Sequence, residues 1–256
     1  MKLNNKKDTL LLILLSIFIV IGIGLVLSPI YKRRISDKRK ITQTIEDFEK
    51  MLNKNDSDTK NISHLDLNEV EAQNEIIGIL YIPKIQIILP IYNNTSEYAL
   101  SNGTGILREY GKPYGKKGTH PILTSHAGLE DGLFTNLKDL KKGDHFYIRD
   151  DTGKFNKYTI FGTNTILPDD YSKFVINKDI SQVTLLTCTS IEGFNSHRLL
   201  KHGKKVKFDK DEFEREQNKL YLTKYEKIVL SVFVILILLT VIIIKGRFRK
   251  WKINYL

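Results

Sequence analysis

The sequence is poor in cysteine and has no internal repeat, and each shortage excludes a class of protein. Cys188 is the single cysteine among 256 residues, so no intramolecular disulfide can form. Neither a paired Cys-x-x-Cys motif nor a glycine-rich phosphate loop occurs. We therefore expect no disulfide framework, no metal and no cofactor. A lone thiol in a protein with an exported domain is a chemical liability unless it is buried or used.

Charged residues are missing from two long stretches. Residues 9–31 and residues 228–244 are uncharged and rich in Leu, Ile and Val. About 20 apolar residues cross a bilayer as a helix, and slightly fewer suffice where flanking cations reach outward. We predict transmembrane helices at 9–31 and 228–244. No alanine precedes Ala72, which disfavours a cleaved signal peptide. A buried core helix is the alternative for the second stretch, but only twelve residues follow it.

The charge pattern does not orient the chain in a membrane. Lysine and arginine lie on both sides of the first apolar stretch, and a basic tail follows the second. The net charge is +11, yet the lysines are scattered and no nucleic-acid-binding motif occurs. We therefore expect contact with anionic membrane lipid rather than nucleic acid. Residues 1–8 are predicted to be a cytoplasmic tail and residues 245–256 a basic cytoplasmic tail.

Between the apolar stretches, the spacing of hydrophobic residues changes once, from that of a helix to that of strands. Residues 32–75 read as a juxtamembrane helix and linker, a possible lid region, because Ile41, Ile45, Phe48 and Leu52 recur at helical spacing. Residues 76–210 contain about eight short strand candidates, which favour a single all-β barrel. Short helices are expected at 95–100 and 133–140, and residues 211–227 form a connecting segment. The strand candidates are 77–82, 85–92, 104–107, 121–125, 145–149, 158–167, 183–188 and 198–206.

Three residues could form a catalytic set at the ends of these strands. Cys188 ends a strand of apolar and β-branched residues, which would hold its thiol rigidly, although a free cysteine is more often a core filler. His126 ends another strand, where its ring could face a cleft. Arg198 follows Cys188 by ten residues, a spacing that suits a hairpin and would place a guanidinium beside the thiol as an oxyanion donor. A surface cation is the alternative for Arg198.

The remaining histidines are weaker candidates. His120 opens the strand that ends at His126 and is expected to be structural, and His64 falls in the linker. His145 directly follows Asp144, which is expected in a turn. His197 and His202 are expected at the surface.

Several ordered segments resemble sortases, the cysteine transpeptidases of bacterial surface proteins. Thr184-Leu185-Leu186-Thr187-Cys188 resembles the family's cysteine motif, and 123–126 and 195–200 resemble its histidine and arginine segments. Residues 78–92 and 133–144 are also typical. The resemblance implies a closed eight-stranded sortase-type β-barrel outside the cell membrane of a Gram-positive bacterium. It implies Cys188 as nucleophile, His126 as general acid and Arg198 as stabiliser of substrate and oxyanion, supported by Thr184 and Thr187.

The same resemblance implies the partners. The enzyme would cleave an LPxTG-like sorting signal between Thr and Gly and transfer it to an amine. The segment Asn195-Ser196-His197-Arg198-Leu199-Leu200 and the second apolar stretch resemble class C, whose acceptor is a pilin lysine. Two departures stand out: residues 32–75 lack an Asp-Pro-aromatic lid motif, and Ser190-Ile191-Glu192-Gly193 replaces Pro-Tyr-Gly. The alternatives are a housekeeping sortase that uses the cell-wall precursor and a non-catalytic, membrane-tethered β-barrel that binds a partner.

Overall fold

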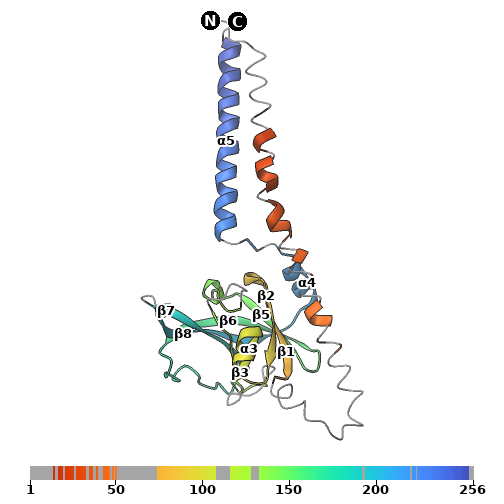
Figure 1. The fold of residues 1–256 in the computed structure, drawn as a ribbon, viewed down its shortest axis with the longest axis vertical. Helices are drawn as coiled ribbons and strands as arrows, with labels where there is room; N and C mark the ends of the chain where they lie inside the picture. The colour runs from red at the N-terminus through yellow and green to blue at the C-terminus, as the bar shows by residue number, and fades with distance from the viewer. Residues whose placement is uncertain are drawn as a thin grey trace. The chain divides into compact units, whose positions relative to one another are not determined.

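The computed structural model describes residues 74–107, 116–127, 133–191, 194–219, 221–222 and 224–253, with separate positions between 14 and 50. The chain forms two compact units, one of residues 37–221 and one of residues 1–36 with 222–256. The elements, labelled in Figure 1, are β1 Ile76–Ile82, η1 Pro83–Ile85, β2 Ile87–Tyr92, α3 Glu97–Asn102, β3 Thr104–Leu107, β4 Ile122–Thr124, η3 Leu137–Asp139, β5 His145–Asp150, β6 Phe155–Ile166, β7 Gln182–Ile191, β8 Phe194–Val206, α4 Lys210–Asn218 and α5 Lys224–Ile253.

The eight strands close into a barrel in the order β1-β2-β3-β4-β7-β8-β6-β5. β2 pairs with β3 and β4 pairs with β7 in parallel, and the other neighbours are antiparallel. Closure leaves no free strand edge. The predicted eight-stranded barrel is confirmed, and β3 has the predicted bounds.

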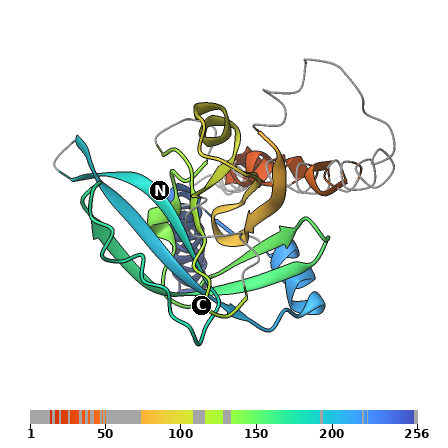
Figure 2. The same ribbon diagram turned by 90° about the horizontal axis from the view of Figure 1, so that it is seen from below.

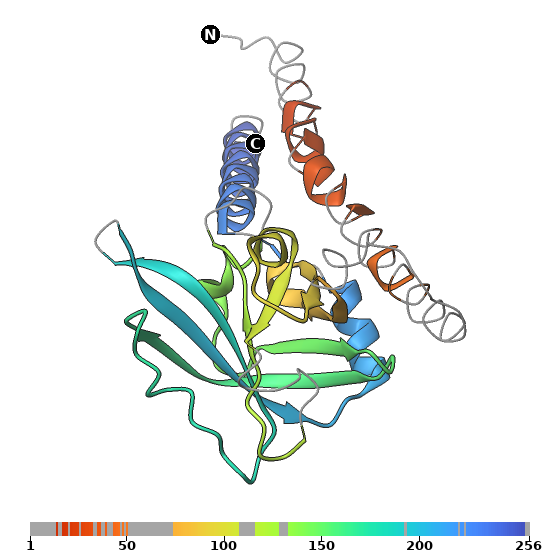
Figure 3. The same ribbon diagram turned by 60° about the horizontal axis from the view of Figure 1, so that its bottom comes forward.

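Side chains alternate between the two faces of β7 and β8, as the pleat requires. Val183 and Leu185 on β7 and Leu199 on β8 belong to the main core inside the barrel. Leu186 and Leu200 instead join a second apolar cluster with Ile122, Ile166, Phe174 and Leu107. The outer face of this hairpin is therefore covered, and the segment 167–181 between β6 and β7 supplies Phe174 to the cover. Figure 3 shows the long β7–β8 hairpin in teal.

A third cluster attaches α4 to the barrel. Phe213 of α4 is buried against Tyr81, Tyr147 and Phe155, with ring centroids 4.8 to 5.8 Å apart. Figure 2 shows α4 in blue beside the green β5–β6 hairpin. Asp209 caps α4 by accepting from the backbone N–H of Glu212. The helix ends at Asn218, so the predicted connecting segment 211–227 is not one continuous helix.

The unit of residues 1–36 and 222–256 contains one described stretch that is long and apolar enough to cross a membrane. This stretch is Glu226–Ile243 in α5, with a mean hydropathy of 2.7. It overlaps the predicted span 228–244. A shorter apolar helix covers Ile17–Lys32. A Cβ added at Gly22 would lie 2.9 Å from a ring carbon of Phe233, so the two helices approach closely there. Residues 1–13 and 51–73 lie outside the described residues, and so does most of the predicted lid region.

One local prediction was wrong. Residues 133–140 form turns and the three-residue η3 rather than an α-helix, because their backbone bonds run from Leu137 N–H to Phe134 O and from Leu140 N–H to Leu137 O, three residues back instead of four. His145 is the first residue of β5, as the strand prediction for 145–149 had it, and its Nδ1 lies 2.9 Å from Thr159 Oγ1.

Candidate active site

Cys188 and Arg198 are directly opposite each other on β7 and β8. Their Cα atoms are register partners in the antiparallel ladder. Residues opposite each other in such a ladder project to the same face with Cβ atoms about 5 Å apart. Cys188 is partly buried and shares the outer face of β7 with Leu186 rather than the barrel interior. The thiol is therefore not a core filler, and the guanidinium lies on its own side of the sheet.

His126 follows β4, which runs parallel to β7. Ile122, Leu123 and Thr124 pair with Thr184, Leu185 and Leu186. The pairing is prolonged by two further hydrogen bonds: Ser125 N–H donates to Leu186 O at 3.3 Å, and Thr187 Oγ1 donates to Ser125 O at 2.8 Å. The same offset of 62 residues separates Thr187 from Ser125 and Cys188 from His126. His126 therefore follows β4 at the level of Cys188.

Two side chains fix the chain just before His126. Ser125 is buried and donates from its hydroxyl to Gly103 O at 2.6 Å. Thr187, also buried, makes the bond from β7 described above. A Cβ at Gly103 would lie 2.6 Å from the backbone oxygen of Pro90, so only glycine permits this approach. These contacts give Thr187 a clear structural role beside the site.

Glu97 of α3 contacts His126, which the sequence did not predict. Its carboxylate lies 3.0 Å from His126 Nε2 and also accepts from the Ser101 hydroxyl. The hydrogen bond with His126 lowers the pKa of Glu97. The contact holds one ring nitrogen of His126 and leaves Nδ1 for another partner. The two residues are 29 positions apart, so no local signal links them.

Arg198 is held through the backbone of its own strand. Its Nη1 donates to the carbonyl of His197 at 3.3 Å, and its Cα pairs with Ile166 of β6 on the side away from Cys188. A guanidinium held this way keeps donors for a substrate carbonyl or an oxyanion.

Thr184 does not reach the thiol, because it lies four residues earlier on β7. Its hydroxyl is fully buried between His120 and His202. The prediction that His120 is structural agrees with its 1% exposure. The prediction that His202 lies at the surface was wrong: only 6% of it is exposed, because the outer face of β8 is covered at this position.

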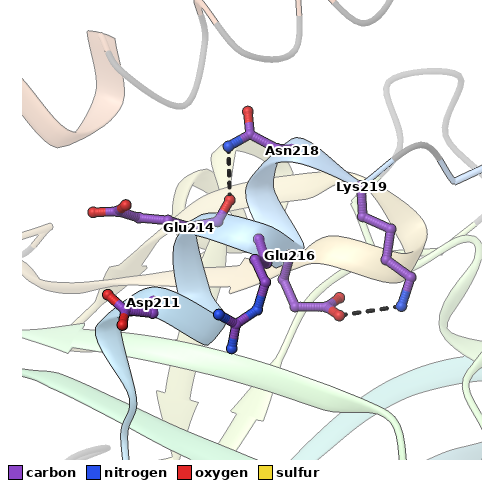
Figure 4. A pocket seen from close by; sticks show the side chains of 6 residues that line it. Asp211, Glu214, Glu216, Asn218 and Lys219 are labelled. Atoms are coloured by element: carbon purple, nitrogen blue, oxygen red, sulfur yellow. Dashed lines mark hydrogen bonds and ion pairs between the residues drawn. The ribbon is translucent and has the colours of Figure 1, made fainter.

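One pocket of the described residues lies elsewhere. Asp211, Glu214, Arg215, Glu216, Asn218 and Lys219 line it on α4 and just beyond (Figure 4). Lys219 pairs with Glu216 in this pocket at 3.1 Å. None of these residues lies on β4, β7 or β8, so this pocket is separate from Cys188.

Comparison with known proteins agrees with this arrangement. The family model described as the sortase domain matches residues 80–206. Sortase A of Bacillus anthracis is 27% identical over 207 residues, which cover 78% of this chain and 95% of that protein. A lid mutant of sortase A from Corynebacterium diphtheriae is 38% identical, with a TM-score of 0.53, over 58% of this chain and 79% of that one. Sortase C1 of Streptococcus agalactiae, solved in complex with MTSET, is 31% identical, with a TM-score of 0.51, over 68% and 92%.

Proposed function

Because the chain belongs to the sortase family of cysteine transpeptidases, which act on sorting-signal proteins, we propose that Cys188, His126 and Arg198 are its catalytic residues. The observation that supports this most is the register: Cys188 is opposite Arg198 on β8, and β4, which ends two residues before His126, runs parallel to β7. The substrate is an LPxTG-like signal cleaved between Thr and Gly.

Each residue has one task in the proposed reaction. The Cys188 thiolate attacks the threonine carbonyl, and the Arg198 guanidinium donates to the oxygen as it becomes negative. When the C–N bond breaks, His126 gives its proton to the glycine amine. The thioacyl-enzyme then accepts an amine nucleophile, His126 removes a proton from that amine, and Cys188 leaves as thiolate.

The test uses the full-length chain in detergent micelles with an LPxTG-containing peptide. We expect a mass increase on Cys188 that equals the peptide up to threonine, and transfer to an added amine. Cys188→Ala should abolish both. Arg198→Lys should retain little activity, because an ammonium cannot reproduce the planar guanidinium fork. A fully active Cys188→Ala enzyme would refute the proposal. Peptide binding without cleavage by the wild type would support the non-catalytic alternative instead.

The acceptor is proposed to be a pilin lysine. Support comes from the likeness to sortase C1 of Streptococcus agalactiae and from the segment 195–200. The curated relatives named sortase A favour the second candidate, attachment to the cell-wall precursor. Competition between a lysine-containing pilin fragment and an oligoglycine or diaminopimelate amine separates the two. Preferential transfer to lysine supports the first, and preferential transfer to the cell-wall amine contradicts it.

We further propose that 9–31 and 228–244 span the membrane and place the barrel outside the cell. α5 supports the second span. Cys188 is the only thiol in the chain, so it reports its own side of the membrane. A membrane-impermeant maleimide should label wild-type protein in intact cells, with Cys188→Ala as the unlabelled control. Labelling only after cell lysis would contradict an extracellular barrel.

A further inference from the structure

A buried chain of side-chain hydrogen bonds links β7 and β8, which carry Cys188 and Arg198, with the residues just before β4. Thr184 is opposite His202 in the same ladder in which Cys188 is opposite Arg198, four residues away along each strand. An even spacing keeps both pairs on one face of the sheet. His120 lies two residues before the start of β4 and six residues before His126.

The distances connect these groups into one chain. Thr184 Oγ1 lies 2.6 Å from His120 Nε2 and 2.8 Å from His202 Nδ1. At one end, His120 Nδ1 lies 2.9 Å from the carbonyl oxygen of Val175, in the segment 167–181. At the other end, His202 Nε2 lies 3.0 Å from Asn164 Oδ1 on β6.

This chain of hydrogen bonds has one arrangement of protons in which every group is neutral. The Val175 carbonyl only accepts, so His120 must donate from Nδ1 and accept at Nε2. Thr184 then donates to His120 and accepts from His202 Nδ1–H. A neutral His202 must accept at Nε2, which requires the Asn164 amide to turn by 180° from its orientation in the structure, so that its NH₂ group faces the ring. With the amide oxygen there instead, the chain carries one more proton and a positive charge.

The hydrogen-bond chain attaches the segment 167–181 to the sheet beside the proposed site. Phe174 of this segment packs in the cluster that includes Leu186 and Leu200, the residues two positions from Cys188 and Arg198 on the same face. Ile180 O accepts from Gly118 N–H at 3.0 Å, so a second attachment lies near the far end of the segment. Val175 is between these points, and its side chain is 68% exposed, so its carbonyl rather than its side chain is what attaches it.

We propose that His120, Thr184 and His202 are positioning residues that hold the segment 167–181 against the outer face of β7 and β8, where it forms one wall of the donor-peptide site. This deepens the proposed function and rests on Cys188 as the nucleophile. Loss of the chain should weaken peptide binding more than bond cleavage, because backbone pairing holds Cys188 opposite Arg198 independently of it.

Kinetics separate positioning from a structural role. In the full-length chain, Thr184→Val should raise the KM for the donor peptide about tenfold and change kcat less than about threefold, since it leaves two buried nitrogens without their partner. Thr184→Ser restores the hydroxyl and should restore KM. His202→Asn should have a similar effect, and the double variant should be no worse than either single one. Thr159→Val, which removes a threonine–histidine contact between β5 and β6, is the matched control and should leave KM unchanged.

Hydrogen exchange tests the attachment without using activity. Amides of residues 170–178 should exchange faster in Thr184→Val than in the wild type, while those of β1 and β5 stay protected. His120→Asn replaces Thr184→Val if the latter does not fold. Unchanged exchange in 170–178, a fall in kcat at constant KM, or additive effects in the double variant would each overturn the proposal. If Cys188→Ala remained active, the nucleophile would be wrong, but the exchange result would still decide whether the chain holds the segment.

Discussion

The burial of His202 should make the barrel sensitive to acid. Desolvation and the neighbouring His120 and Lys173 lower the pKa of His202 to about 4 from an ordinary value of 6.5. The folded state therefore resists a proton that the unfolded state accepts. The stabilisation is complete above pH 6.5 and is lost as the pH falls from 6.5 to about 4. One pKa unit corresponds to 1.36 kcal/mol, so His202 alone should lower the free energy of unfolding by about 2 kcal/mol at pH 5 and about 3 kcal/mol at pH 4, relative to pH 7.

The measurement is the difference between the wild type and His202→Asn across this range. Urea unfolding of the full-length chain in detergent, followed by near-ultraviolet circular dichroism of the packed tyrosines, gives the free energy at each pH. His202→Asn should be less stable at pH 7 because it loses the bond to Asn164, yet should lose less stability on acidification. Carboxylates titrate in both proteins and cancel in the comparison. Equal losses between pH 7 and pH 4 in the two proteins would refute the reasoning.

Three other predictions follow from single contacts. Glu97→Ala should lower kcat by about threefold and Glu97→Gln by less, because glutamine retains an acceptor for His126; steady-state kinetics at one pH decides this. Thr187→Val should lower kcat by about tenfold at unchanged KM by releasing the carbonyl that precedes His126, and Thr187→Ser should restore it. Gly203→Ala should lower the free energy of unfolding by about 2 kcal/mol in urea titration, because its Cβ would lie 2.5 Å from the ring of Phe146.

The barrel could be predicted because each strand carries its own signal. β-branched and apolar residues bounded by turns predicted all eight strands, and boundaries differed by a few residues, as at β6, which begins at Phe155 instead of Tyr158. The position of Arg198 opposite Cys188 also followed from the sequence, since two strands joined by a short loop pair as a hairpin.

Contacts between segments that are distant in the sequence could not be predicted from local patterns. His202 lies among lysines, which suggested a surface position, yet its ring is buried between Thr184 and Asn164. Its neighbour Lys201 is also buried and donates to Leu140 O at 2.6 Å, so polarity on β8 did not indicate exposure. Glu97 was missed for the same reason: its contact with His126 depends on where α3 lies in the folded chain.

The two sides of β7 are secured in different ways, and this determines where the site is vulnerable. β8 pairs with β7 along nearly its whole length, so a one-residue slip that would turn Cys188 into the core is opposed at many positions. β4 pairs with β7 at only three residues, Ile122–Thr124, and His126 lies beyond them. The position of His126 therefore depends on a few single bonds outside the ladder, made by Ser125, by Thr187 of β7 and by Glu97 of α3. Substitutions that leave the barrel folded should accordingly displace the proposed acid, His126, more readily than they separate Cys188 from Arg198.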